Sequence, residues 1–201
     1  MIHVNRRSAT ESKKKILGAA TTVFSRYGYR GSSMRTIAEA AGISIGGLYL
    51  YFKNKEDLYG TLIRNMLDDL TEETREALRD IQDPAEAMST FISMRVKYAR
   101  RHRELILVLG KEQAITFGLR AKRKFFEDQK RVIEEIVRKG IASGRFRSCD
   151  ESGVAKIIIC ALRGFVLSMI LEPEALFSPE ECSILILKGI LAKGQGTHRT
   201  E

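Results

Sequence analysis

Apolar residues recur every three or four positions along most of the chain, as one face of a helix requires. The first such segment covers residues 16–27, and Gly28 directly after it is a residue type that ends helices. Ser8, followed three residues later by Glu11, forms a capping-box pattern. The pattern therefore predicts a first helix from Ser8 to about Tyr27.

Two shorter apolar patterns follow, and a single glycine separates them. Ser33 is placed to cap the first helix and Ser44 the second. Gly42 between them can take a positive φ, and the small Ala38 four residues earlier lets two helices cross closely. Residues 32–52 thus predict a helix-turn-helix, with an ordinary helical hairpin as the alternative. The second helix is polar along one side and can lie in the major groove of DNA. Its outward residues are Ser44, Ile45, Gly46, Gly47, Tyr49 and Tyr51.

Beyond residue 53 the chain again shows helical periods and no strand alternation. Residues 193–201 have no apolar face, so we expect a flexible tail there. Together with the first three helices, six further segments predict an all-α chain of about nine helices. The six are Asn54 to about Asp80, the helix opened by Asp83-Pro84, 105–117, 125–141, the helix after Asp150, and the helix after Ser178-Pro179.

The positive charge is concentrated at one end of the chain. The 201 residues are 44% hydrophobic and 29% charged, which argues against disorder. Of the formal charge of +9, residues 1–55 carry +8 and residues 56–201 carry +1. A basic module beside a nearly neutral one is typical of proteins that bind a polyanion, although a solubilising basic surface gives the same balance.

Several function classes are excluded by what the sequence lacks. No run reaches the roughly 18 uncharged apolar residues of a membrane span, and the N-terminus has no apolar segment of a secretory signal. Three cysteines without metal-ligand spacing fit a reducing cytosol, and we expect Cys160, within an apolar run, to be buried. No catalytic motif appears and the three histidines are isolated. We therefore expect a cytoplasmic protein that is not an enzyme, with no membrane partner, catalytic residue, metal site or cofactor.

Residues 37–58 read IAEAAGISIGGLYLYFKNKEDL. This stretch resembles the N-terminal signature of the TetR family of bacterial transcriptional regulators, and the resemblance extends over roughly residues 10–60. It implies an N-terminal three-helix helix-turn-helix domain for DNA binding and a C-terminal helical domain for ligand binding and dimerisation. We place the first domain at residues 1–55 and the second at residues 56–201.

The resemblance implies that the second motif helix enters the major groove. Arg35 would then reach a base, and three further residues match family positions that hold phosphates. Ile45 stands where Lys, Arg or Gln is common and offers only apolar contact, so direct readout depends chiefly on Arg35 and Tyr49. The implied base-facing residues are Ile45, Gly46, Gly47 and Tyr49. The implied phosphate-holding residues are Ser33, Tyr51 and Lys55.

The two most apolar segments are residues 154–171 and 184–191. A helix that is apolar on every side is buried on every side, and a chain of this length has one domain for these helices to pack against. Their remaining faces would meet a second subunit. We predict a homodimer through the helices at residues 154–171 and 179–192, and the family resemblance implies the same arrangement.

Large, adaptable apolar side chains in the second domain can line a ligand cavity, although plain core packing would use the same residues. Arg163 interrupts an apolar helix, so it must pair with an acid, reach solvent or bind an anionic ligand. An apolar cavity with an arginine at its mouth suits an acyl-CoA or another amphipathic acid. The candidate ligand-binding residues are Phe91, Met94, Arg95, Tyr98, Phe117, Phe125, Arg163, Phe165 and Met169.

Together these features predict a ligand-responsive repressor. Its homodimer would bind a palindromic operator in double-stranded DNA and would be released by a small amphipathic or apolar effector, with an acyl-CoA as one example. Three alternatives remain open: a regulator without an effector, a protein that binds DNA without sequence preference, and a helical carrier of lipid or acyl-CoA.

Overall fold

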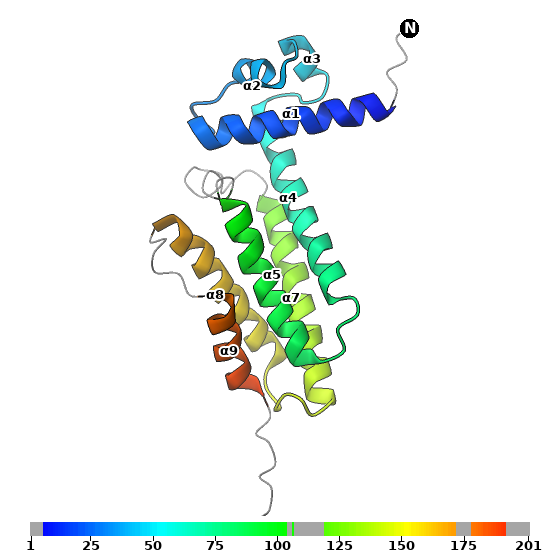
Figure 1. Cartoon of the computed structure of the whole chain (residues 1–201), viewed down its shortest axis with the longest axis vertical. Coiled ribbons are helices and arrows are strands. Elements are labelled where there is room, and N and C mark those ends of the chain that lie inside the picture. The colour runs from blue at the N-terminus through cyan, green and yellow to red at the C-terminus, as the bar shows by residue number, and fades with distance from the viewer. Residues whose placement is uncertain (1–5, 104–105, 107–118, 172–177, 192–201) are drawn as a thin grey trace, which may run out of the picture. The chain divides into compact units, whose positions relative to one another are not determined.

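The computed structural model describes residues 6–103, 106, 119–171 and 178–191. Within these residues the chain forms eight helices and no strand, so the predicted all-α fold class is confirmed (Figure 1). The helix expected at residues 105–117, apart from Ile106, and the tail at 193–201 lie outside the described residues. The helices are α1 (Arg6–Tyr27), α2 (Met34–Ala41), α3 (Ile45–Tyr49), α4 (Lys55–Leu78), α5 (Pro84–Arg101), α7 (Leu119–Ala142), α8 (Glu151–Leu171) and α9 (Pro179–Ile190).

The chain divides into two compact units. The first contains residues 1–69 and 102–122, and the second contains residues 70–101 and 123–201. Helices α4 and α7 therefore contribute to both units. The predicted domain boundary at residue 55 coincides with the first residue of α4, and the assignment of DNA binding and ligand binding to its two sides stays a prediction.

Local chemistry determines several of the helix ends. Ser33 and Ser44 each accept the backbone N–H three residues further on, at 3.0 Å in both cases. Gly42, with a φ of 62°, closes α2 in the left-handed conformation that favours glycine. Ser178 makes both bonds of a capping box at the start of α9. These four predicted signals are confirmed.

The start of α1 differs from the prediction. The helix begins at Arg6, so Ser8 lies inside it and the capping-box interpretation of Ser8 and Glu11 is wrong. Arginine favours helices, and no proline or glycine stands between Arg6 and Ser8 to stop the helix from extending toward the N-terminus.

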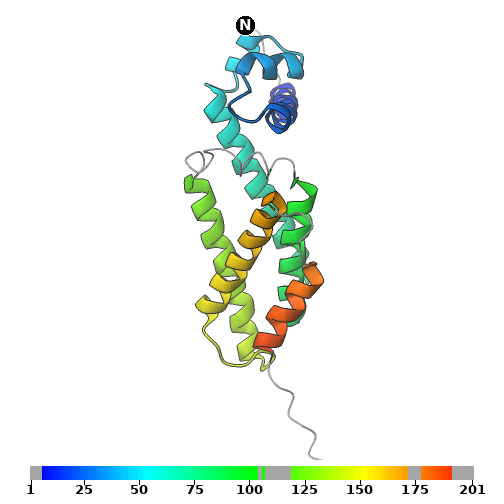
Figure 2. The same ribbon diagram turned by 90° about the vertical axis from the view of Figure 1, so that its left-hand side faces the viewer.

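The first unit has a core built from α1, α2, α3 and the beginning of α4. In both views α2 and α3 lie on the same side of α1 (Figures 1 and 2). Phe24 of α1, Ile37 of α2 and Leu48 of α3 are fully buried there. Tyr59 of α4 packs edge-on against Phe24, with ring centroids 5.2 Å apart, and holds α4 to α1.

The second unit is a bundle in which α5 packs against α8 and α9 (Figure 2). One continuous apolar cluster joins all four helices of this bundle. Its fully buried members include Met88 and Ile92 of α5, Ile133 and Val137 of α7, and Ile158 of α8. Packing in this cluster holds α5, α7 and α8 in place. Each of these helices carries candidate ligand-binding residues toward its other end.

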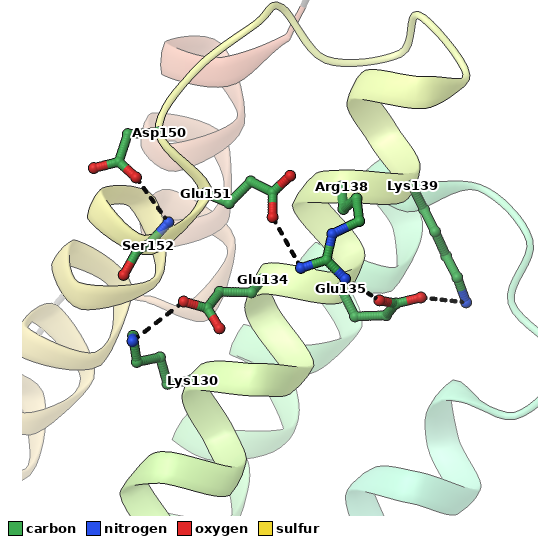
Figure 3. Close-up of polar contacts among 8 residues, drawn as sticks. All are labelled: Lys130, Glu134, Glu135, Arg138, Lys139, Asp150, Glu151 and Ser152. Carbon is green, nitrogen blue, oxygen red and sulfur yellow. Dashed lines mark hydrogen bonds and ion pairs between the residues drawn. The ribbon is translucent and has the colours of Figure 1, made fainter.

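Exposed ion pairs line α7, and one of them reaches the start of α8 (Figure 3). Arg138 of α7 binds Glu135 at 2.8 Å and Glu151, the first residue of α8, at 3.0 Å. Lys139 approaches the other carboxylate oxygen of Glu135 at 3.6 Å. Because exposed pairs contribute less than about 1 kcal/mol each, this set orients the start of α8 while the apolar cluster supplies the stability.

Candidate nucleic-acid interface and effector site

The α2–turn–α3 segment presents an outward face that the core of the first unit does not use. Leu48 points inward and is fully buried, whereas Ile45, Tyr49 and Leu50 expose 38%, 51% and 87% of their surface. Arg35, at the second position of α2, is exposed as well. Exposed apolar and aromatic side chains beside an arginine form a surface able to contact base edges and thymine methyl groups.

Two adjacent glycines on α3 differ in what surrounds them. A Cβ on Gly47 would lie 3.1 Å from Oγ of Ser44, the atom that caps the helix. A Cβ on Gly46 would meet nothing within 4 Å. The fold therefore has no packing reason for glycine at position 46, although glycine weakens a helix. The surface is left open at this point to an approaching partner.

Lys55 has a structural role that the sequence did not indicate. Its Nζ donates hydrogen bonds to the backbone carbonyls of Tyr29 and Ser32, at 2.6 and 2.7 Å, and lies 4.3 Å from the Tyr29 ring centroid. These bonds tie the start of α4 to the loop before α2. The implied contact of Lys55 with a phosphate stays a prediction, as do those of exposed Ser33 and half-buried Tyr51.

Several basic residues of the first unit lie on its surface. Lys13, Lys14 and Lys15 of α1 and Lys53 before α4 are exposed, like Arg35. Positive side chains around the α2–α3 face favour a polyanion, and phosphate contacts position a protein on DNA while base contacts specify the sequence.

In the second unit the structure brings together three of the candidate ligand-binding residues. Arg95 of α5 lies with its guanidinium carbon 4.8 Å from the ring centroid of Phe91 and 5.3 Å from that of Phe125 on α7. Its side chain is 8% exposed, and none of its three guanidinium nitrogens has a hydrogen-bond partner among the described residues. Burial lowers the pKa of Arg95 to about 9, against a smaller opposing effect of Tyr98, so the group remains charged at neutral pH.

Arg163 occupies a different environment. It is exposed on α8, and its guanidinium carbon lies 3.7 Å from the ring centroid of Phe126. The Phe126 ring in turn contacts that of Phe125, with centroids 5.4 Å apart. Phe126 belongs to the large apolar side chains of the second domain that the sequence predicts can line a ligand cavity.

The remaining candidates are spread through the second unit or lie outside the described part. Tyr98 and Phe165 are buried, and Met94 is half-buried. Phe117 falls outside the described residues, and Met169 lies in α8 with a side chain that the structure does not describe. Whether these residues contact a ligand stays a prediction.

Helices α8 and α9 leave large apolar side chains uncovered. Ile157 and Leu167 of α8 are 67% and 54% exposed, and Ile184 and Leu185 of α9 are 50% and 72% exposed. Cys160 is exposed on α8 too, which corrects the expectation that it is buried. Residues 157, 160, 164 and 167 share one face of α8 by helical spacing, and this face is exposed, whereas Ile158 beside it is buried.

Among the described residues, no helix combines the length and the apolar character that a membrane span requires. Nor do residues 6–103, 106, 119–171 and 178–191 group three or more His, Cys, Asp or Glu side chains where a metal ion could bind.

Comparisons with known proteins identify relatives of this chain. Residues 16–62 match the family model described as bacterial regulatory proteins, tetR family. An uncharacterised HTH-type transcriptional regulator of Bacillus subtilis, YhgD, is 26% identical over 74% of this chain and 79% of its own length. The HTH-type transcriptional repressor KstR2 of Mycolicibacterium smegmatis is 30% identical over 67% of each chain.

A solved structure has the same fold. The transcriptional regulator FadR of Bacillus subtilis, in complex with stearoyl-CoA, superposes with a TM-score of 0.73 at 24% identity, over 87% of this chain and 95% of FadR. The likeness extends over both units of the chain described above.

Proposed function

This chain belongs to the tetR family of bacterial regulatory proteins and is a transcriptional regulator, and from that premise we propose that its homodimer represses transcription from a palindromic operator and is released by a small amphipathic effector. The observation that carries the proposal is the exposed α2–α3 face, where Ile45, Gly46 and Tyr49 stand open on a basic unit. In this proposal these three residues face base edges, together with Gly47 and Arg35.

The uncovered face of α8 and α9 supports the homodimer. Ile157, Leu167, Ile184 and Leu185 form large exposed apolar groups on two helices, and exposed apolar surface of this kind favours a protein partner. A two-fold interface uses the same surface on both subunits, so one uncovered face is sufficient. A dimer also presents two reading heads, which matches a palindromic operator.

The effector is supported by the aromatic and cationic side chains of the second unit. Arg95 lies beside the rings of Phe91 and Phe125, and Arg163 lies beside the ring of Phe126. Aromatic rings next to a cation suit a ligand with an apolar body and a negative charge. Among solved relatives of this fold, FadR of Bacillus subtilis contains stearoyl-CoA.

Effector binding would reach the DNA through α4. This helix begins at Lys55, just after the helix-turn-helix, and runs to Leu78 in the second unit. A ligand that shifts α4 would change the spacing of the two reading heads. Effector and operator must then weaken each other's binding by the same factor.

Selection of duplexes from a random DNA pool tests the proposal. We compare the unmodified chain with Tyr49→Ala and with the control Tyr27→Ala, because Tyr27 is 50% exposed and Tyr49 51%. We expect enrichment of a palindrome, with Tyr49→Ala weakening binding by about 1–3 kcal/mol, or roughly 5- to 150-fold, and Tyr27→Ala having no such effect.

The other outcomes separate the alternatives. Salt-sensitive binding without an enriched sequence would indicate a DNA-binding protein without sequence preference. Absence of any DNA binding, with retained lipid binding, would indicate a helical carrier. An enriched palindrome whose binding responds to no amphipathic compound would leave a regulator without an effector.

A further inference from the structure

Arg95 buries a positive charge in the second unit, and no acid of the described residues pairs with it. Buried charges are normally paired, because removing an ion from water is costly. Yet Nε, Nη1 and Nη2 of Arg95 all lack a partner among the residues that the structure describes. Three acids of the facing helix α7 are engaged elsewhere: Asp128 pairs with Arg131, Glu134 with Lys130 and Glu135 with Arg138. The fourth acid, Glu127, is exposed.

The aromatic neighbours of Arg95 satisfy its charge only in part. The rings of Phe91 and Phe125 attract the cation through their faces. A guanidinium directs its N–H donors along its own plane in a rigid fork, and ring faces leave these donors unbonded. The fork fits a carboxylate in a two-bond, planar arrangement.

A second buried polar group without a hydrogen-bond partner among the described residues lies on the face of α7 that carries Phe125. Gln129 follows Phe125 by four residues and therefore shares its helix face. Gln129 is 4% exposed, and its Oε1 is buried without a hydrogen-bond partner among the described residues. The unbonded donors of Arg95 thus contact Phe125, and the unbonded acceptor of Gln129 lies one helical turn further along the same face of α7. Buried polar groups are rarely left unpaired.

We infer that Arg95 is the anchor for the carboxylate of an apolar monocarboxylic acid, whose body lies against Phe91 and Phe125 and whose hydroxyl or amide N–H donates to Gln129. This inference rests on the proposed effector and specifies its class. One guanidinium balances one carboxylate. A CoA thioester has lost the free carboxylate of its acid and carries several phosphate charges, so Arg95 would favour the free acid over the thioester.

Binding measurements on the full chain test the inference. The probes are dodecanoate, 3-hydroxydodecanoate, methyl dodecanoate and dodecanoyl-CoA, each used below its micelle concentration and titrated by calorimetry. We expect the two free acids to bind and the ester and thioester to bind at least about tenfold more weakly. The hydroxy acid should bind more tightly than dodecanoate, and Gln129→Leu should abolish this preference.

Substitution of Arg95 provides the sharper comparison. Arg95→Met should weaken binding of both free acids about 100-fold, as the loss of one partner of a buried charge pair does. The control Arg131→Met removes an exposed arginine of α7, 77% of whose side chain is accessible, and should bind the acids like the unmodified chain.

The melting temperature without ligand separates a binding role from a structural one. Because Arg95→Met replaces an unpaired buried charge by an apolar chain of similar length, it should raise Tm by about 2–4 °C. If Arg95 served only to brace the two rings, the same change would lower Tm. Arg95→Lys keeps the charge without the fork and should weaken acid binding while keeping the chain folded.

Operator binding by the same preparations keeps the two proposals distinguishable. The inference is overturned if no free acid binds, if the thioester binds more tightly than the acid, or if Arg95→Met retains full affinity. In each case the chain can still bind its palindrome, and the regulator stands. If the acids bind through Arg95 but leave the operator complex intact, the site stands and release by this effector is contradicted.

Discussion

Gly46 leaves the outer surface of α3 open at a position where the fold would tolerate a side chain. A Cβ there would meet nothing within 4 Å, and alanine favours a helix over glycine by about 0.5–1 kcal/mol. We expect Gly46→Ala to raise the free energy of unfolding by up to that amount and to weaken operator binding at least about tenfold, because the methyl group fills space needed by a base edge. Urea unfolding and fluorescence anisotropy with a labelled duplex measure the two quantities.

Gly18 of α1 provides the matched control, because a Cβ there also meets nothing within 4 Å. Gly18→Ala should give the same small gain in stability with unchanged operator affinity. If Gly46→Ala binds the operator as tightly as the unmodified chain, α3 does not bring this position close to the bases.

The two arginines of the second unit show what a single residue's sequence context can indicate. Arg163 is a candidate ligand-binding residue in the sequence because it interrupts an apolar run. In the structure it is exposed and reaches solvent across the Phe126 ring, as a long side chain can do from an apolar helix. Arg95, in a segment of mixed polarity, is the buried one. The sequence shows the residue type but not which side of a helix the neighbouring elements cover. It therefore makes both arginines candidate ligand-binding residues without showing which of them is buried.

At the scale of helices, caps formed by local bonds were predictable, whereas contacts between segments far apart in the sequence were not. Ser33, Ser44 and Ser178 cap their helices through residues three positions away, which the sequence displays directly. Lys55 instead binds carbonyls 23 and 26 residues earlier in the chain. Only the packing of α4 against the first helices brings these groups together, so no local pattern announces the contact.

The start of α5 provides a prediction about pH. Asp83 accepts the N–H of Ala85 at 3.1 Å, and its two oxygens bind Nε and Nη2 of Arg145, each at 3.1 Å. The bond from Ala85 and, after it, the pair with Arg145 hold the pKa of Asp83 below its ordinary value. The folded-state pKa is thus lower than the unfolded one, so the stabilisation is complete above the unfolded pKa and is lost as pH falls through the folded one.

We expect Asp83→Asn to lower the free energy of unfolding at pH 7 by no more than about 1 kcal/mol, since the pair is partly exposed and asparagine still caps a helix. The difference from the unmodified chain should shrink toward zero as the pH falls below the ordinary pKa of an aspartate. Urea unfolding at a series of pH values from neutral downward measures it. A difference that stays constant over all pH values would show that the ionised carboxylate contributes nothing.

At the scale of the whole molecule, the hydrophobicity of a helix predicts that its surface is buried but not whether the same chain or a second subunit covers it. Helices α8 and α9 are apolar on most sides, and the sequence indicated burial all round. Within one chain Ile158 and Phe165 are buried, while Ile157 and Leu167 remain open. The proposed homodimer would cover this remainder, and the exposed Cys160 lies in the same apolar stretch of α8.

Introducing charge on this face tests the dimer and the coupling of dimerisation to DNA binding. Ile157→Glu and Leu185→Glu each replace a side chain that is at least two-thirds exposed in one chain, so the monomer should fold with little loss. In a two-fold interface each change occurs twice and leaves two unpaired carboxylates without water, so the dimer dissociation constant should rise at least about 100-fold. Sedimentation equilibrium measures that constant.

Affinity for the full palindrome should fall in parallel, because a monomer contacts one half-site. Lys124→Glu, at an exposed position of α7, should leave both quantities unchanged. Dimers that persist in both α8 and α9 variants would contradict an interface on this face and would require the exposed apolar groups to meet another partner.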